Sequence, residues 1–137
     1  MKNPVERAKT LKTAQTWADA LGWEVIPSPL LSRYHQAGVW LPVEARAEDL
    51  EQALQHEIVW AFRGGYAAVH LVPTLLKAQA NGRPWLIGYS DITVLHAGWR
   101  VRGWGPTLYG TLSETLSDAR QAESLGAALR GEAYTCS

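Results

Sequence analysis

A serine with an aspartate beside it, Ser90-Asp91, stands between an apolar run, Trp85-Leu86-Ile87, and a segment of helical spacing that continues to Val101. The turn Gly88-Tyr89-Ser90-Asp91 therefore has features of a nucleophile elbow. In such an elbow a tight strand-to-helix turn exposes the serine hydroxyl, and the next backbone N–H helps to form an oxyanion hole. Ile92 replaces the second glycine of the G-x-S-x-G pattern. A Ser-Asp helix cap is therefore an alternative interpretation of the same turn.

A second turn, Arg63-Gly64-Gly65-Tyr66, follows the continuous apolar run from Ile58 to Phe62. Such a run is typical of a parallel strand that is covered on both faces. Two glycines directly after it indicate positive φ angles or a close approach of the backbone. In an open α/β sheet, ligands bind at the carboxyl ends of the strands. The glycine N–H groups and the Ser90 hydroxyl are thus expected to face the same small volume.

Helical spacing and cap residues predict the elements that hold these two turns. The segment Asn3-Pro4-Val5-Glu6 has the features of a helix start, and the helix is expected to end at Leu21 with Gly22 as its C-cap. Three further helices are predicted, at residues 46–55, 67–79 with an interruption at Pro73, and 111–129, and one further strand at residues 23–27. This alternation predicts an open, mostly parallel, flavodoxin-like α/β sheet with helices on both faces. The length suits one domain over residues 1–137.

The composition excludes several classes of function. Thirteen basic and thirteen acidic side chains cancel without long runs of one sign, so neither nucleic acid nor a membrane surface is an expected partner. The single Cys136 excludes an intrachain disulfide and a cysteine-based zinc site. No stretch approaches the roughly 20 apolar residues of a membrane-spanning helix, and the N-terminus lacks the apolar core of a secretory signal. A small molecule or another protein is therefore the expected partner.

Five motifs together resemble the N-terminal half of the LD-carboxypeptidases, also called muramoyltetrapeptide carboxypeptidases, and of their relatives that give immunity to microcin C. They occur in the family's order and at approximately its spacing, and they cover residues 4 to about 110. The motifs are Leu21-Gly22-Trp23-Glu24-Val25, Ala45-Arg46-Ala47-Glu48-Asp49-Leu50, Arg63-Gly64-Gly65-Tyr66, Gly88-Tyr89-Ser90-Asp91-Ile92-Thr93 with Leu95-His96, and Gly105-Pro106.

The resemblance implies a serine peptidase of the bacterial cytoplasm that removes the terminal D-alanine from a murein tetrapeptide, without a metal or cofactor. It implies Ser90 as the nucleophile. The oxyanion donors would be the backbone N–H of Asp91 and one from the Gly64-Gly65 turn. The candidates for contact with the peptide substrate are Arg63, Tyr66 and Tyr89.

Most of these polar candidates have a structural alternative. Arg63 could bind a substrate carboxylate with its planar guanidinium or could tie the strand end to a loop. Tyr66 and Tyr89 could line a pocket or fill the core. Arg46 and Asp49 lie in the motif that resembles the family's segment near the substrate, but a surface ion pair three residues apart explains them equally well.

The chain also departs from the family pattern. The family's first strand, before the first helix, is expected to be missing, and Ala67 and Trp104 replace a common glycine and a common histidine. The Glu and His that complete the family's triad lie in a C-terminal domain, so the chain is expected to be inactive alone, because a serine without a base is a poor nucleophile. A homodimer or a missing C-terminal domain is the expected partner. The alternative function is a non-catalytic α/β module that binds a small ligand or self-associates.

The four histidines do not supply an obvious base. His96 lies six residues after Ser90, so its side chain is expected to point away from the hydroxyl and to be packed or partly exposed. His70 is expected to be solvated or to cap a helix, and His56 to be exposed. His35, in a predicted loop, is the least constrained and the one worth testing.

Overall fold

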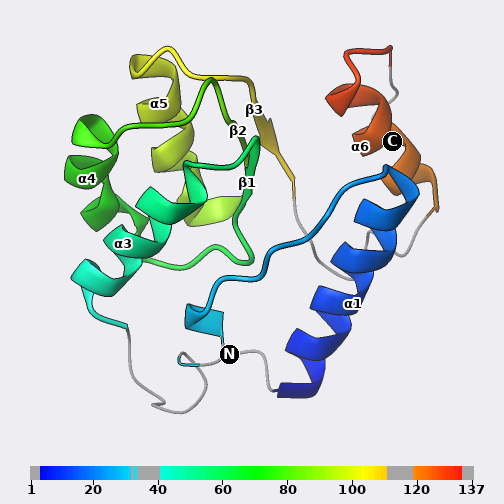
Figure 1. Ribbon diagram of the computed structural model, residues 1–137, viewed down its shortest axis with the longest axis horizontal. Helices are drawn as coiled ribbons and strands as arrows, with labels where there is room; N and C mark the ends of the chain where they lie inside the picture. The colour runs from blue at the N-terminus through cyan, green and yellow to red at the C-terminus, as the bar shows by residue number, and fades with distance from the viewer. Residues whose placement is uncertain (1–3, 32, 34–40, 111–118, 134–137) are drawn as a thin grey trace. The chain divides into compact units, whose positions relative to one another are not determined.

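The computed structural model describes residues 4–31, 33, 41–110 and 119–133, and the chain divides into two compact units (Figure 1). Unit 1 combines Met1–Pro27 with Leu112–Ser137, and unit 2 comprises Ser28–Thr111. That the two units make up one domain remains a prediction.

Unit 1 contains the helices α1 (Pro4–Ala20) and α6 (Ala119–Leu129). Helix α1 ends as its sequence predicts, because Gly22 adopts a φ of 72° and the Trp23 N–H donates to the Ala18 carbonyl at 2.8 Å. This left-handed cap satisfies carbonyl groups that a helix end leaves unpaired. The predicted first helix and its glycine cap are therefore confirmed, while the predicted N-cap Asn3 lies outside the described residues.

Unit 2 is built on a sheet of three parallel strands in the order β1-β2-β3. Helix α3 precedes β1, η1 and α4 connect β1 to β2, and η2 and α5 connect β2 to β3. The bounds are α3 Val43–Ala53, β1 Ile58–Trp60, η1 Ala68–Leu71, α4 Val72–Lys77, β2 Trp85–Gly88, η2 Ser90–Ile92, α5 Thr93–Val101 and β3 Thr107–Tyr109. The predicted open, parallel α/β sheet is confirmed.

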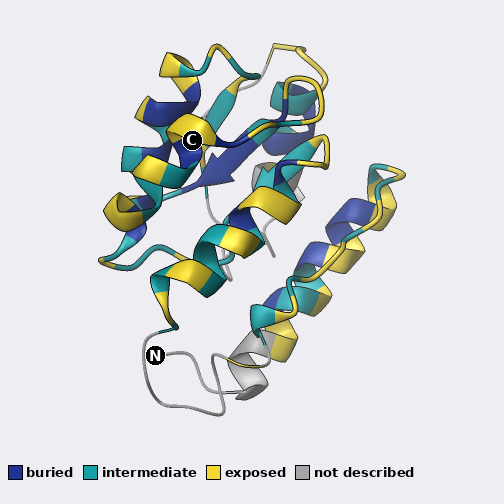
Figure 2. Ribbon diagram, turned by 60° about the vertical axis from the view of Figure 1, so that its left-hand side comes forward, coloured by how far each residue is buried: buried dark blue, intermediate teal, exposed yellow. Residues whose placement is uncertain are grey.

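One hydrophobic core joins α3, α4 and α5 to the sheet of unit 2 (Figure 2). Its fully buried members include Leu54, the C-cap residue of α3, and Leu75 of α4, Leu86 of β2 and Trp99 of α5. Val59 of β1 packs against the same cluster. These helices therefore cover the face of the sheet that carries Val59 and Leu86, while helical cover of the opposite face remains a prediction.

Two predicted elements differ from the observed ones. Residues 23–27 form no strand: they take part in neither of the described strand ladders, and Ile26 is 61% exposed. A strand needs a partner for its backbone, and Pro27 lacks the N–H that such a ladder uses. The predicted helix at 67–79 is interrupted near Pro73 as expected, but its first part, η1, is a 3-10 helix. Helix α4 begins at Val72, because Pro73 is tolerated only in the first turn of a helix, where its missing N–H has no partner to lose.

The C-terminal part of unit 2 also holds an element that the sequence did not predict as a strand. Thr107–Tyr109 pairs with β2 as the third strand, in the register Leu86↔Thr107 to Gly88↔Tyr109. The predicted helix at 111–129 is confirmed as α6 in its second half, and residues 111–118 lie outside the described part of the chain.

Replacing Trp99 by phenylalanine is expected to destabilise the chain. The Trp99 side chain is 0% exposed, and its indole N–H donates to the Pro84 carbonyl at 2.7 Å. Trp99→Phe leaves that buried carbonyl unpaired, which costs about 1–3 kcal/mol in the free energy of unfolding. Urea denaturation measures this loss.

The matched control is Trp104→Phe. The Trp104 ring packs edge-on against Trp99 at 4.9 Å, but no hydrogen bond of its indole is recorded among the described residues. An equal loss of stability in both variants would show that ring volume, and not the hydrogen bond to Pro84, is what the core requires.

Candidate active site at the serine turn

The two turns singled out in the sequence are in direct contact. They follow β1 and β2, which are adjacent and parallel, and the Ala61 N–H extends their ladder by donating to the Ile87 carbonyl at 2.8 Å. A Cβ atom built on Gly64 would lie 2.9 Å from the Cβ and 3.3 Å from the Oγ of Ser90. The backbone at Gly64 therefore lies against Ser90 at a distance that only glycine permits.

Ser90 has the backbone geometry of a nucleophile elbow. Its φ is 57°, and it is the only non-glycine residue in the described part of the chain with a positive φ. Its side chain is exposed. The Thr93 hydroxyl donates to the Ser90 carbonyl at 2.6 Å, which ties the turn to the start of α5. A strained backbone that presents an exposed hydroxyl distinguishes this turn from an ordinary helix cap, and no side-chain cap bond forms at Tyr89, the residue before η2.

Gly88 and Ile92 explain how the elbow forms without the second glycine of the usual pattern. A Cβ on Gly88 would lie 2.5 Å from the Cγ2 of Ile92 and 3.2 Å from the Cβ of Ala61. Ile92 is buried in the core and occupies the space that Gly88 leaves open. The close approach of strand and helix is therefore achieved with one glycine on the strand side.

The Asp91 side chain connects the elbow to the glycine turn. Its Oδ2 atom accepts hydrogen bonds from the backbone N–H groups of Ala67 and Ala68, each at 2.8 Å. Both donors lie at the start of η1, where N–H groups have no partner within the helix. An ionised acceptor makes such bonds stronger than neutral ones. Asp91 thus fixes the distance between the two turns.

Arg46 also binds the backbone at Ala67. Its Nη1 donates to the Ala67 carbonyl at 3.1 Å, so the peptide groups on both sides of Ala67 are bound by side chains from α3 and η2. Asp49 instead accepts a hydrogen bond from the Ser28 hydroxyl. The surface ion pair between Arg46 and Asp49, one of the two predicted alternatives, is therefore not formed.

The Gly64 and Gly65 amides are available as donors. Within the described part of the chain, neither N–H group donates to another residue. A Cβ on Gly65 would have its nearest contact at 3.8 Å, to Asp91 Oδ2, so Gly65 is less crowded than Gly64. Two adjacent unused amides beside an exposed serine can bind the oxygen of a substrate.

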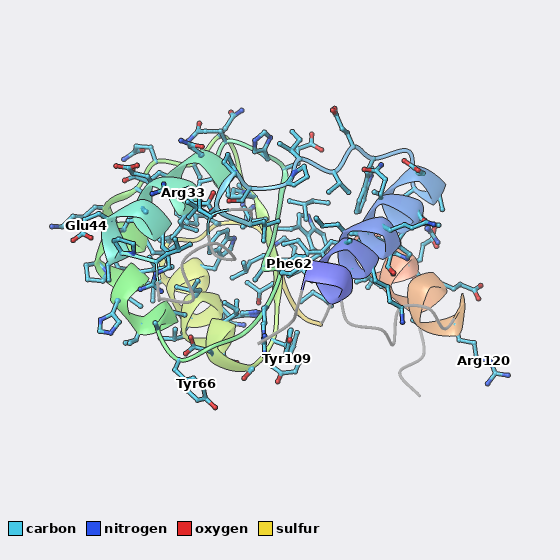
Figure 3. All side chains as sticks on the ribbon, turned by 90° about the horizontal axis from the view of Figure 1, so that it is seen from below. Arg33, Glu44, Phe62, Tyr66, Tyr109 and Arg120 are labelled. Atoms are coloured by element: carbon cyan, nitrogen blue, oxygen red, sulfur yellow. The ribbon has the colours of Figure 1, made fainter. Side chains whose placement is uncertain are left out.

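The three residues predicted to contact a substrate differ in exposure. Arg63 is exposed and Tyr66 is 88% exposed, so Tyr66 does not fill the core. Tyr89 is half-buried. Figure 3 shows the Tyr66 and Tyr109 side chains projecting outward at the lower edge of unit 2. Arg63 makes no recorded hydrogen bond to another described residue, so it does not tie the end of β1 to a loop.

None of the described histidines is hydrogen-bonded to Ser90. His56 and His70 are exposed, as expected, and His35 lies outside the described residues. His96 is half-buried, and its ring centroid lies 6.4 Å from that of Tyr109. Burial lowers the pKa of His96, and a hydrogen bond with the Gly88 backbone raises it in part. His96 is therefore a packed, neutral side chain near pH 7, which agrees with its expected role.

Sequence reasoning did not identify Tyr109 as part of this site. Its hydroxyl accepts a hydrogen bond from the Ser90 N–H at 3.2 Å. No local sequence pattern predicts this contact, because the two residues are 19 positions apart and meet only through the pairing of β3 with β2.

In the part of the chain that the structure describes, no group of three or more His, Cys, Asp and Glu side chains could hold a metal ion. None of the helices in the described part is long and apolar enough to span a membrane.

Comparison with known proteins points to one family. The sequence pattern of the LD-carboxypeptidase N-terminal domain matches residues 2–110. A Rickettsia prowazekii protein assigned as a carboxypeptidase is 36% identical over 103 residues, which cover 65% of this chain and 31% of that protein. A murein tetrapeptide carboxypeptidase of Pseudomonas aeruginosa is 41% identical over 81 residues, covering 54% of this chain and 25% of that protein. The chain thus spans less than a third of the length of these relatives.

Proposed function

Because the chain belongs to the LD-carboxypeptidase family through its N-terminal domain, we propose that it carries the nucleophile half of a serine carboxypeptidase site, with Ser90 as the nucleophile. The observation that supports this most directly is the positive φ of the exposed Ser90, with the Gly64 backbone packed against it. A helix cap needs neither feature. A nucleophile elbow with an adjacent oxyanion hole needs both.

The substrate class follows from the relatives. One of them is named for the murein tetrapeptide, so the proposed reaction is removal of the terminal D-alanine from that peptide, in the cytoplasm and without a metal or cofactor. Arg63, which is exposed beside the glycine turn, would attract the substrate carboxylate, and Tyr66 and Tyr89 would line the approach.

The proposed chemistry begins with attack of the Ser90 hydroxyl on the carbonyl carbon of the bond before D-alanine. The negative charge then develops on the carbonyl oxygen. There the N–H of Asp91 and one N–H of the Gly64-Gly65 turn stabilise it. D-Alanine leaves with a proton, and water releases the acyl group from Ser90 in a second step. Losing one such donor costs a hundredfold to a thousandfold in rate, about 2.7–4 kcal/mol, in well-studied enzymes.

The base that takes the Ser90 proton is the part of the site that the described residues do not offer, since none of their histidines is bonded to Ser90. The matched region is the N-terminal domain alone. We therefore place the Glu and His of the triad in a C-terminal domain. Residues 1–137 by themselves are then expected to be inactive.

Labelling with a fluorophosphonate probe tests this proposal. Residues 1–137 alone should react very slowly, and the same residues joined to the C-terminal region of the Pseudomonas aeruginosa relative should be labelled at Ser90. We call this second protein the joined chain. The joined chain should also release D-alanine from a murein tetrapeptide. Ser90→Ala should abolish both results, whereas Ser28→Ala, which changes another serine of unit 2, should leave them intact.

Two outcomes would contradict the proposal in different ways. A folded joined chain that is never labelled would favour the non-catalytic alternative, a module for ligand binding or self-association. Efficient hydrolysis by residues 1–137 alone would show that the base lies within this chain.

A further inference from the structure

Tyr109 is held against the nucleophile turn by the sheet itself. It pairs with Gly88, the residue that begins the elbow, in the register of β2 and β3, and the next residue's N–H, from Gly110, donates to the Gly88 carbonyl at 3.1 Å. The tyrosine backbone is therefore fixed directly beside the strand end from which Ser90 projects.

The Tyr109 side chain is unusually exposed for its size. It is 68% exposed, so packing in the core does not explain its position. Its hydroxyl instead accepts a hydrogen bond from the Ser90 N–H at 3.2 Å. Its ring lies beside the His96 ring of α5, with 6.4 Å between the ring centroids. His96 contacts the tyrosine from the helix that follows the elbow, so the ring is supported on one side.

The bond to Tyr109 acts on the one strained residue of the turn. A positive φ at a non-glycine residue persists only where its surroundings determine it. Ser90 is the first residue of η2, so its N–H has no partner within that helix, and Tyr89, the residue before η2, makes no side-chain cap bond. Tyr109 gives that N–H its recorded partner.

We propose that Tyr109 is a positioning residue: by accepting the Ser90 N–H, its hydroxyl keeps Ser90 in the left-handed conformation that aims the nucleophile. This inference rests on the proposed function of Ser90. The Tyr109 hydroxyl uses its oxygen to accept the hydrogen bond from the Ser90 N–H. Its own O–H can therefore donate to a ligand in front of Ser90.

The substitution Tyr109→Phe tests the proposal, because it removes the hydroxyl and keeps the ring on His96. In residues 1–137, NMR should show that the Ser90 amide proton shifts upfield and exchanges faster with solvent. In the joined chain, kcat and the labelling rate at Ser90 should fall about threefold to tenfold with KM unchanged, the effect of one lost hydrogen bond. Ser28→Ala, which removes a hydroxyl that is bonded to Asp49 in unit 2, should alter neither.

The two measurements separate this proposal from the function on which it rests. An unchanged Ser90 amide in Tyr109→Phe would overturn the hydrogen bond and the proposal with it. A changed amide with an unchanged labelling rate would overturn the positioning role. A changed amide in a joined chain that is never labelled would support the bond and overturn the peptidase function alone.

Discussion

Gly64→Ala is expected to reduce labelling of Ser90 in the joined chain about a hundredfold. The new methyl group would stand 2.9 Å from the Ser90 Cβ, closer than such atoms approach in folded proteins, and 3.2 Å from the Tyr89 carbonyl oxygen, a tight contact. Ser90 or the glycine turn must then move, and a misplacement of about 1 Å can cost a factor of about 100 in rate. The measurement is the second-order rate of fluorophosphonate labelling.

The adjacent residue provides the matched control. In Gly65→Ala the new methyl group would have its nearest contact at an ordinary 3.8 Å, and neither glycine has a positive φ that would make alanine strained. Gly65→Ala is therefore expected to be labelled at close to the original rate. If Gly64→Ala reacts as fast as Gly65→Ala, the two turns do not form one site.

Asp91→Ala is expected to lower both the free energy of unfolding and the rate of Ser90 labelling. The change removes two charge-assisted hydrogen bonds of 2.8 Å and leaves the N–H groups of Ala67 and Ala68 without that partner. Charged hydrogen bonds contribute about 1.5–3 kcal/mol each, so with partial exposure a loss of about 2–4 kcal/mol in the free energy of unfolding is expected. The glycine turn then loses its fixed distance from Ser90, and the labelling rate should fall more than tenfold.

Two variants show whether the Asp91 carboxylate acts through the turn. Asp91→Asn keeps an oxygen acceptor without the charge and should lie between wild type and Asp91→Ala in both urea denaturation and labelling. Asp49→Ala removes a carboxylate whose partner is the Ser28 hydroxyl, away from the glycine turn, and should leave labelling unchanged. Equal losses of labelling in Asp49→Ala and Asp91→Ala would mean that general destabilisation is the cause.

The elements near the site could be predicted because their signals are local. The apolar runs at 58–62 and 85–87, the glycines that end them and the helical spacing after Ser90 each lie within a few residues of the structure they specify. The parallel order of the strands then follows from the helical crossovers, and it brings the two turns to one edge. The contact between Gly64 and Ser90 is a consequence of that order.

The contacts that were missed join residues far apart in the sequence. The carboxylate of Asp91 binds residues 23 and 24 positions away, a contact that was not predicted. Tyr109 depends on the register of a three-residue strand that has no strong pattern of its own. The opposite error occurred at residues 23–27, where an apolar run predicted a strand that finds no partner among the described residues. Pairing, unlike periodicity, is not encoded within one segment.

The positive φ of Ser90 has a consequence for mutational drift. Holding a serine in this conformation costs about 1–3 kcal/mol, whereas glycine adopts it freely. On folding stability alone, a random change of codon 90 to glycine would thus be tolerated or even favoured, and it would delete the hydroxyl at the same time. Only a requirement for the hydroxyl opposes that change, so a copy of the chain released from such a requirement is expected to lose its serine early while keeping its fold.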